Sequence, residues 1–376
     1  MRTWDIFCRI VDNFGDIGVT WRLAKQLTSE HGRSVRLWID DMPTASKLIS
    51  SLESDSAVQI VEDVQICHWD HANTAEPADV VIEAFACDLP ISYIQRMTAD
   101  KNIWINLEYL SAETWVESFH AQASRHSTLP LIKYFYFPGF TPHTGGLLRE
   151  QNLIARRDAF LGSEATQSTF QKKLGIAESD ILKVSLFCYP EAPISQLLDA
   201  FATSPEPVLC LVPESSSWHV LSRNLGATLR QGIPVRHGQL TLLPLPFLTQ
   251  DEYDQLLWLC DMNFVRGEDS WIRAIWAGKP MVWQPYRQQE DTHLEKLAAF
   301  LEFYADGLNP ELTKLLHQSH DSWSRDTFES GLWGEYSRRL PELGAHAKRI
   351  ADKLASESDL ASKLVIFVEK IHENQV

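Results

Sequence analysis

The feature that most limits the possible folds of this chain is an alternation of short apolar runs with helical patterns, which occurs twice. The first series runs from residue 4 to about residue 150, and the second starts near residue 181. Strands that alternate with helices are typical of parallel sheets covered by helices on both faces. A chain of 376 residues is long enough for two such domains, each with its own core.

The predicted elements follow from the length and periodicity of the apolar runs. In the first series we expect strands at 4–11, 35–39, 79–85 and 102–107, helices at 19–28, 43–52 and 90–97, and a last strand followed by a loop within 133–150. In the second series we expect strands at 181–189, 208–212, 241–245, 262–265 and 281–284, and helices at 194–202, 251–259, 271–277 and 292–304. Residues 151–178 and 309–376 are expected to be mainly helical.

This order predicts an α/β protein with two Rossmann-like domains. The first domain is expected to span 1–178 and to include 357–376, because in two-domain enzymes of this kind the last helix often crosses back to the first domain. The second domain is expected to span 179–356. Ligands of open parallel sheets bind beyond the carboxyl ends of the strands, so turns at those ends are the places to look for a site.

The charge and cysteine content exclude several classes of function. A net charge of −16 disfavours nucleic acid as a main partner, although it allows a cationic target such as an arginine side chain. The six cysteines are scattered through apolar runs without a CxxC pair, which predicts reduced, buried thiols in a cytoplasmic protein. The beginning of the chain does not resemble a signal peptide, and no apolar run of about 20 residues predicts a membrane span.

The first candidate motif is VDNFGDIG at residues 11–18, where a strand is expected to turn into a helix. Its glycines, Gly15 and Gly18, match neither a dinucleotide-binding fingerprint nor a Walker loop. One interpretation makes Asp12 a turn former and Asp16 a helix N-cap. The other makes them a carboxylate pair that orients an acceptor nucleophile and takes its proton. Because carboxylates repel phosphate, we expect a phosphate site in the other domain.

The second motif is FVRGEDSWIRAIWAGKP at residues 264–280, where Gly267 turns a strand into a helix. Backbone amides at a helix N-terminus hold phosphate well, and Arg266 is placed to add charge-assisted bonds to a diphosphate. Glu268 is placed to accept a hydrogen bond from a hydroxyl of the nucleoside sugar. The alternative is an ordinary glycine turn followed by an acidic first helical turn, Glu268 and Asp269.

Aromatic residues near the same strand ends are candidates for the walls of a nucleotide pocket. Phe247 is placed to stack on a base and Gln250 to read its edge, although core packing is the alternative for Phe247. Phe187 and Tyr189 lie on one face of a strand, either as pocket walls or as core.

Three acidic residues directly after strands, Glu83, Asp88 and Glu108, are candidates for the acceptor side, with helix N-capping the favoured role for Asp88. The thirteen histidines show no HxxxH or HExxH spacing, so no metal site is expected.

Five stretches occur in a specific order: DIFCRIVDNFGDIGVTWRLAKQL, VVIEAFACDLP, NLEYLSAE, GGLLRE and VRGEDSWIRAIWAGKP. Together they resemble the EarP family, the bacterial protein-arginine rhamnosyltransferases that modify translation elongation factor P. The resemblance covers residues 4 to about 300. It implies a GT-B fold, which consists of two facing Rossmann-like domains, and a reaction that requires no metal and no cofactor. It also implies dTDP-β-L-rhamnose as donor and one arginine of elongation factor P as acceptor.

The family reaction inverts the anomeric centre, and the modified factor is active in rescuing ribosomes stalled at polyproline. The resemblance makes the first domain the acceptor domain and the second the donor domain. It implies catalytic roles for Asp12 and Asp16, with Asp16 favoured as general base. It further implies donor binding by Asn13, Phe14, Gly15, Phe187, Tyr189, Phe247, Gln250, Arg266, Glu268, Asp269 and Ser270.

Two other functions stay open on the sequence. One is a GT-B transferase that acts on a small molecule or a lipid carrier, although the chain shows no basic amphipathic patch for a membrane surface. The other is a protein that binds a translation factor without catalysis. The presence of Asp12 and Asp16 together with Glu268 argues against a protein that only binds, because such a protein does not need both an acceptor site and a donor site.

Overall fold

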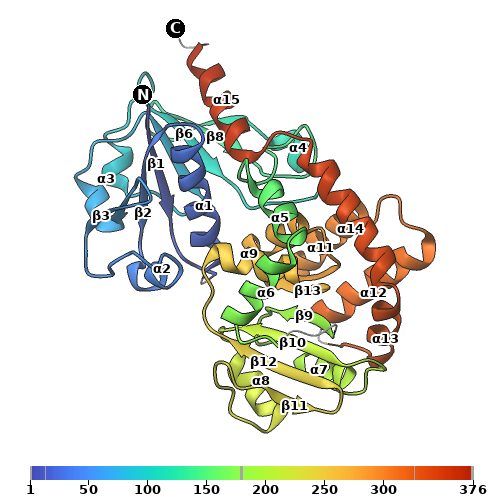
Figure 1. Cartoon of the computed structure of the whole chain (residues 1–376). Coiled ribbons are helices and arrows are strands. Elements are labelled where there is room, and N and C mark those ends of the chain that lie inside the picture. The colour runs from blue at the N-terminus through green and yellow to red at the C-terminus, as the bar shows by residue number, and fades with distance from the viewer. Residues whose placement is uncertain (1, 13, 178–180, 326, 374–376) are drawn as a thin grey trace. The chain divides into compact units, whose positions relative to one another are not determined.

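The computed structural model describes residues 2–12, 14–177, 181–325 and 327–373 (Figure 1). The chain divides into two compact units, each an α/β structure with its own sheet. The first unit is Met1–Gln151 together with Ala355–Val376, and the second is Asn152–Leu354.

The first unit contains an eight-stranded sheet with the order β3-β4-β2-β1-β5-β6-β8-β7. The six central strands are parallel, and the edge strands β3 and β7 are antiparallel to their neighbours. Its strands are β1 (Thr3–Cys8), β2 (Ser34–Ile39), β3 (Val58–Val61), β4 (Val64–His68), β5 (Val80–Ala84), β6 (Ile103–Leu107), β7 (Gln122–Arg125) and β8 (Ile132–Tyr136). Its helices are α1 (Gly15–Ser29), α2 (Met42–Leu48), η1 (Trp69–Asn73), α3 (Ile91–Ile94), α4 (Val116–Phe119) and α15 (Leu360–Glu373).

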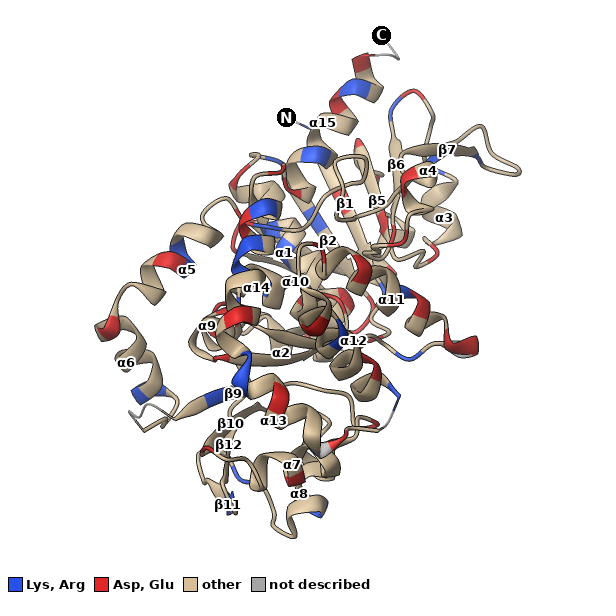
Figure 2. Ribbon diagram, turned by 90° about the vertical axis from the view of Figure 1, so that its right-hand side faces the viewer, with Lys and Arg blue, Asp and Glu red and all other residues tan. Residues whose placement is uncertain are grey.

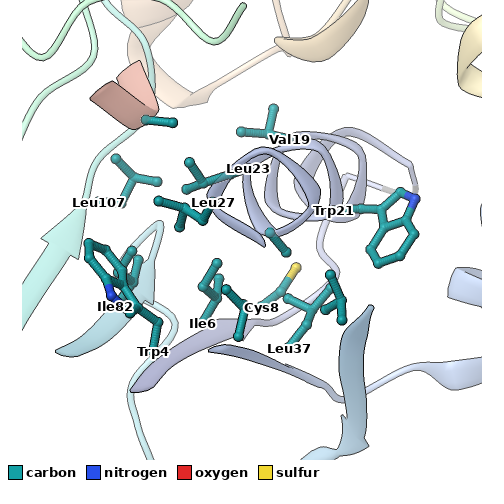
Figure 3. Packing of buried hydrophobic residues seen from close by; sticks show 14 of the residues in the cluster. Trp4, Ile6, Cys8, Val19, Trp21, Leu23, Leu27, Leu37, Ile82 and Leu107 are labelled. Atoms are coloured by element: carbon teal, nitrogen blue, oxygen red, sulfur yellow. The ribbon is translucent and has the colours of Figure 1, made fainter. Parts of the chain in front are cut away.

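The core of the first unit forms where α1 packs on the sheet. Val19, Leu23 and Leu27 recur at helical spacing, which gives α1 one apolar face. These side chains meet Ile6 of β1 and Leu107 of β6 in the core shown in Figure 3. The predicted amphipathic helix is confirmed, although it begins earlier than expected.

The last helix of the chain belongs to this core. Leu364 and Val368 of α15 are buried in the same cluster as α1 and β1. The backbone amide of Leu360 donates a hydrogen bond to the carbonyl of Leu147 at 2.9 Å, and Arg33 pairs with Glu369 at 2.8 Å. The predicted return of the chain to the first domain is therefore confirmed, and Figure 1 shows α15 beside the N-terminus.

A buried carboxylate organises the opposite face of the same sheet. Asp5 of β1 has no exposed surface and accepts hydrogen bonds from Nε and Nη2 of Arg36, at 2.6 and 2.7 Å. It also accepts hydrogen bonds from the Trp38 indole at 2.9 Å and from the Tyr93 hydroxyl. Because a buried charge is tolerated only when it is paired, these donors explain how Asp5 lies within an apolar strand.

The second unit contains a six-stranded sheet with the order β11-β12-β10-β9-β13-β14, parallel except for the edge strand β11. Its strands are β9 (Leu182–Leu186), β10 (Val208–Pro213), β11 (Val235–His237), β12 (Leu240–Leu245), β13 (Met262–Arg266) and β14 (Met281–Gln284). Its helices are α5 (Leu153–Leu161), α6 (Glu164–Lys173), α7 (Ile194–Ala202), α8 (Trp218–Leu225), α9 (Gln250–Leu259), α10 (Asp269–Ala277), η2 (Gln289–Asp291), α11 (Thr292–Tyr304), α12 (Pro310–Ser324), α13 (Ser330–Arg338) and α14 (Leu340–Ala355).

The helices α5 and α6 lie in the second unit, whereas the sequence analysis assigned residues 151–178 to the first domain. Phe160 of α5 meets Trp258 of α9 with their ring centroids 5.7 Å apart, and Arg157 donates to the carbonyl of Trp276 at 2.8 Å. Charged residues add contacts, since Lys173 pairs with Glu252 at 2.6 Å. Figure 2 shows the charge pattern of α6, with an acidic first turn and a basic last turn.

All six cysteines lie among the described residues and are buried without a disulfide, as the sequence predicts. None of the helices in the described part of the chain combines the length and apolar character needed to span a bilayer.

One buried histidine makes the stability of the second unit depend on pH. Burial lowers the pKa of His320 to about 4, and its Nδ1 lies 2.9 Å from the carbonyl of Leu316. Since an unfolded histidine titrates near 6.5, the unfolded chain binds a proton between about pH 6.5 and 4 that the folded chain does not. We therefore expect the free energy of unfolding to fall as the pH is lowered from about 6.5 to 4, by up to about 1.4 kcal/mol per pH unit from this group.

Urea unfolding at several pH values checks this expectation. His320→Leu should flatten the fall in unfolding free energy below pH 6.5, whereas replacement of the exposed His219 by Gln should leave the slope unchanged. Equal slopes for wild type and His320→Leu would contradict the prediction.

Candidate functional site

In the first unit, the candidate site is the turn between β1 and α1. Strand β1 ends at Cys8, three residues earlier than predicted, because the Asp16 side chain folds the following segment into a turn. Oδ2 of Asp16 accepts hydrogen bonds from the backbone amides of Val11 at 2.8 Å and Asp12 at 2.9 Å. Asp16 is 2% exposed and is the second residue of α1, so it is not the N-cap residue that one interpretation of the sequence made it.

Asp12 lies against the start of the same helix. A Cβ atom added to Gly15 would stand 3.1 Å from Oδ2 of Asp12, so glycine leaves room for this carboxylate at the helix N-terminus. Asp12 and Phe14 are both half-buried, and Phe14 is the N-cap residue. Asn13, which the sequence analysis also assigned to this site, lies outside the described residues. The positive end of the helix dipole favours the two carboxylates that gather here.

A tyrosine that the sequence analysis passed over joins this site. The hydroxyl of Tyr109 donates a hydrogen bond to Oδ1 of Asp16 at 3.2 Å, from the chain that follows β6. The motif NLEYLSAE indicated only Glu108 as a candidate. The signal that was missed is a polar aromatic residue just beyond the carboxyl end of a parallel strand.

Two of the three other acidic candidates differ from expectation. Glu83 of β5 is 1% exposed. It accepts hydrogen bonds from the Trp104 indole of β6 at 3.0 Å and from Lys133 Nζ of β8 at 3.1 Å, so it links three strands. Asp88 does not cap a helix, because α3 begins at Ile91 with Pro90 as its N-cap residue. Glu108 is half-buried, and burial together with the charge of Glu83 raises its pKa.

In the second unit, the candidate site is built around Arg266 at the end of β13. Its guanidinium carbon lies 4.5 Å from the ring centroid of Phe187 and 4.5 Å from that of Tyr189. The side chain is 7% exposed, and its Nη1 has no hydrogen-bond partner among the described residues. A buried guanidinium nitrogen without an acceptor is costly, so this geometry favours an anionic ligand.

The turn after Arg266 is held rigidly. Gly267 has a φ of 59°, a left-handed conformation that glycine adopts without strain. The hydroxyl of Ser270 accepts a hydrogen bond from the backbone amide of Arg266 at 3.0 Å and donates one to the backbone carbonyl of Arg266. This hydroxyl therefore shapes the turn, and the backbone amides at the start of α10 are the groups best placed to bind phosphate.

Two of the other predicted donor residues follow this turn directly, and two lie at the loop before α9 and its first residue. Glu268 is the N-cap residue of α10 and Asp269 its first residue, and both are partly exposed. Phe247 is half-buried in the loop before α9, and Gln250 is the first residue of α9 rather than part of that loop. Gln250 shares a helix face with Tyr253, three residues later.

Two tyrosines extend the aromatic walls beyond what the sequence indicated. The ring of Tyr253 meets that of Phe187 edge-on at 5.6 Å, and the ring of Tyr286 meets that of Tyr189 at 5.7 Å. The backbone amide of Tyr189 donates to Gln284 Oε1 at 3.0 Å. The sequence analysis indicated neither tyrosine, because each contacts the site through tertiary packing, which leaves no local pattern.

Each unit thus carries a candidate site of its own at the carboxyl ends of its strands. The first presents carboxylates suited to a cation, and the second presents a buried guanidinium and helix amides suited to an anion. Among the described residues no group of three or more His, Cys, Asp or Glu side chains could hold a metal ion. The expectation of chemistry without a metal stays a prediction.

Residues 4–369 match the family model described as "Elongation-Factor P (EF-P) rhamnosyltransferase EarP". A protein-arginine rhamnosyltransferase of Pseudomonas putida is 45% identical over 370 residues, which cover 97% of this chain and 98% of that protein. The protein of the same description from Pseudomonas aeruginosa is 44% identical over 98% of this chain and 99% of its own length.

Solved structures agree with these matches. A chain from a study of EarP-mediated arginine glycosylation of translation elongation factor EF-P is 35% identical, with a TM-score of 0.72. The match covers 98% of this chain and 99% of that chain. The spinosyn rhamnosyltransferase SpnG is 12% identical, with a TM-score of 0.53 over 98% of this chain and 100% of its own, which shows a shared fold alone. These neighbours confirm the predicted GT-B fold.

Proposed function

The chain belongs to the EarP family of protein-arginine rhamnosyltransferases, and we therefore propose that it transfers L-rhamnose from dTDP-β-L-rhamnose to an arginine of translation elongation factor P. The transfer inverts the configuration at the anomeric carbon. The acceptor is a translation factor, so the reaction takes place in the cytoplasm. Modification activates the factor for ribosomes stalled at polyproline.

The observation that carries the donor assignment is the environment of Arg266. This cation is buried between two aromatic rings, and its Nη1 has no acceptor among the described residues. A diphosphate oxygen supplies an acceptor for this nitrogen, and the amides at the N-terminus of α10 add further donors. We propose that Phe247 and Gln250 bind the thymine base and that Glu268 accepts a hydrogen bond from the hydroxyl of the deoxyribose. The remaining donor contacts are assigned to Asn13, Phe14, Gly15, Phe187, Tyr189, Asp269 and Ser270.

The acceptor assignment follows from the carboxylates of the other half-site. Asp12 and Asp16 lie together at the N-terminus of α1, where a guanidinium ion finds two negative partners. The free guanidinium has a pKa above about 12, so a carboxylate with a pKa near 4 cannot remove its proton in advance. We propose that the two carboxylates hold the guanidinium and localise its charge on the nitrogens that they contact.

The reaction is then a single in-line displacement. One guanidinium nitrogen forms a bond to the anomeric carbon as the bond from that carbon to the diphosphate oxygen breaks, and dTDP leaves with the electron pair. The attacking nitrogen becomes acidic as the new bond forms, and its proton passes to Oδ1 of Asp16. Arg266 and the α10 amides stabilise the charge that develops on the leaving diphosphate.

Mass spectrometry tests this function. The protein is incubated with dTDP-rhamnose and elongation factor P, and the factor is then weighed and sequenced. A mass gain of one deoxyhexose on a single arginine is expected. An unchanged factor would overturn the proposal, and transfer of rhamnose to a small molecule or a lipid carrier instead would identify the alternative acceptor.

Removal of the Arg266 side chain is expected to weaken donor binding. Arg266→Ala should raise the dissociation constant for dTDP by about 10–100-fold, because charge-assisted hydrogen bonds contribute about 1.5–3 kcal/mol. Isothermal titration calorimetry with dTDP measures the change. The matched control is Arg236→Ala on the exposed edge strand β11, which three strands separate from β13. Equal affinities for wild type and Arg266→Ala would remove Arg266 from the donor site.

A further inference from the structure

The contact between Tyr109 and Asp16 joins the carboxyl ends of two strands of the first unit. Asp16 belongs to the helix after β1, and Tyr109 is the second residue after β6. The phenol hydroxyl donates to Oδ1 of Asp16 at 3.2 Å. Tyr109 is 39% exposed while Asp16 is 2% exposed, so the tyrosine reaches from the surface to a buried carboxylate.

The ring of Tyr109 is held in place by Phe85. The two rings are stacked, with centroids 4.3 Å apart and an interplanar angle of 13°. Phe85 and Ala86 have φ values of 58° and 52°, a left-handed conformation that is strained for a bulky side chain. The backbone amide of Phe85 donates to the carbonyl of Leu107 at 2.7 Å, which ties the strained loop to the end of β6. Strain of this kind is kept where it places a functional group.

Tyr109 completes the set of hydrogen bonds that orient the Asp16 carboxylate. Oδ2 accepts the amides of Val11 and Asp12, which fix one oxygen. The terminal torsion of an aspartate is soft, so the orientation of its carboxylate depends on such hydrogen bonds. The bond from Tyr109 gives the second oxygen a partner as well, so both oxygens are held.

We propose that Tyr109 is a positioning residue for rhamnosyl transfer, because its hydroxyl holds Oδ1 of Asp16 where that oxygen receives the proton of the acceptor nitrogen. The proposal rests on the proposed function, in which Asp16 is the proton acceptor. Tyr109 acts through Asp16 and forms no bond to the sugar. A hydrogen bond from Tyr109 also favours the charged carboxylate, so its loss should make Asp16 easier to protonate.

The variant that isolates the hydroxyl is Tyr109→Phe, which keeps the ring that stacks on Phe85. We expect kcat to fall about tenfold or more while KM for the donor stays unchanged, since Tyr109 is none of the residues assigned to the donor. The acidic limb of the pH–rate profile should move up by about one pH unit, the size of one charge-assisted hydrogen bond. The ¹³C titration midpoint of the Asp16 carboxyl group, measured in the full chain without substrate, should move by the same amount.

Tyr93→Phe is the matched control. It also removes a phenol that donates to an aspartate, Asp5, but in the buried network on the opposite face of the sheet. It should lower the melting temperature and leave both the pH–rate profile and the Asp16 midpoint unchanged.

The titration separates the two hypotheses. An unmoved Asp16 midpoint in Tyr109→Phe would overturn the role of Tyr109, whatever the transfer activity. A moved midpoint in a protein that transfers no rhamnose would support the contact and overturn the proposed function.

Discussion

Asp16→Asn is expected to reduce rhamnosyl transfer by about 10²–10⁴-fold, the usual contribution of a general base. The amide oxygen of asparagine can still accept the Val11 and Asp12 amides, and its NH₂ group can face the Tyr109 hydroxyl. The turn therefore keeps its shape, while the group that takes the proton is lost. Mass spectrometry of elongation factor P over a time course gives the rate, and calorimetry with dTDP should show wild-type donor affinity.

Asp359→Asn is the control for this change. Asp359 also accepts a backbone amide, that of Ser362 at 3.0 Å, but it does so at the start of α15 rather than in the β1–α1 turn. The rate of rhamnosyl transfer by Asp359→Asn should stay within a few-fold of that of the wild type. Transfer by Asp16→Asn at the same level would show that Asp16 positions the guanidinium without accepting its proton. An equal loss of donor affinity would instead indicate a damaged fold.

Arg273→Met is expected to destabilise the second unit by about 3–5 kcal/mol, because it leaves a buried charge without its partner. Arg273 of α10 binds Asp254 of α9 through Nε at 2.9 Å and Nη2 at 2.6 Å, and both side chains are 1% exposed. The pair joins the two helices whose first turns carry Gln250 and Asp269. Urea unfolding followed by circular dichroism should show the loss as a lower midpoint.

A second substitution distinguishes a lost partner from lost packing. Replacing both residues, Arg273→Met with Asp254→Leu, should recover most of the stability, since an apolar pair of similar volume needs no charge partner. The exposed pair Lys348–Asp352 is the control, and Lys348→Met should change stability by about 0.5 kcal/mol or less. A wild-type midpoint for Arg273→Met, or a double variant less stable than the single one, would contradict this account.

The parallel sheets could be predicted because buried strands and amphipathic helices leave a periodic record in the sequence. The edge hairpins left no such record. Strand β3 is short and has the apolar Val58 and Ile60 on its exposed side, and β7 exposes all four of its residues, so neither shows apolar residues alternating onto a buried face. The assignment of α5 and α6 was wrong because it depends on contacts such as Phe160 with Trp258, about 100 positions apart, which no local pattern reports.

The candidate site divides in the same way. Asp12, Asp16 and Arg266 lie at or directly beside strand-to-helix turns, where residue type and spacing indicate a ligand. Tyr109, Tyr253 and Tyr286 join the site through a hydrogen bond or a ring contact with residues distant in the sequence. The role of Glu83 was misjudged for the same reason, because its partners Trp104 and Lys133 come from other strands.

The position of α15 has a consequence for synthesis on the ribosome. The first unit emerges first, yet one wall of its core is the last helix to be made, after some two hundred residues of the second unit. During that interval the apolar surface that later contacts Leu364 and Val368 is uncovered, and nascent domains in this condition are prone to aggregate or to bind chaperones. The second unit, which is continuous in sequence, can complete its fold before the first. The order in which the two units become native is therefore expected to be the reverse of the order in which they begin to be translated.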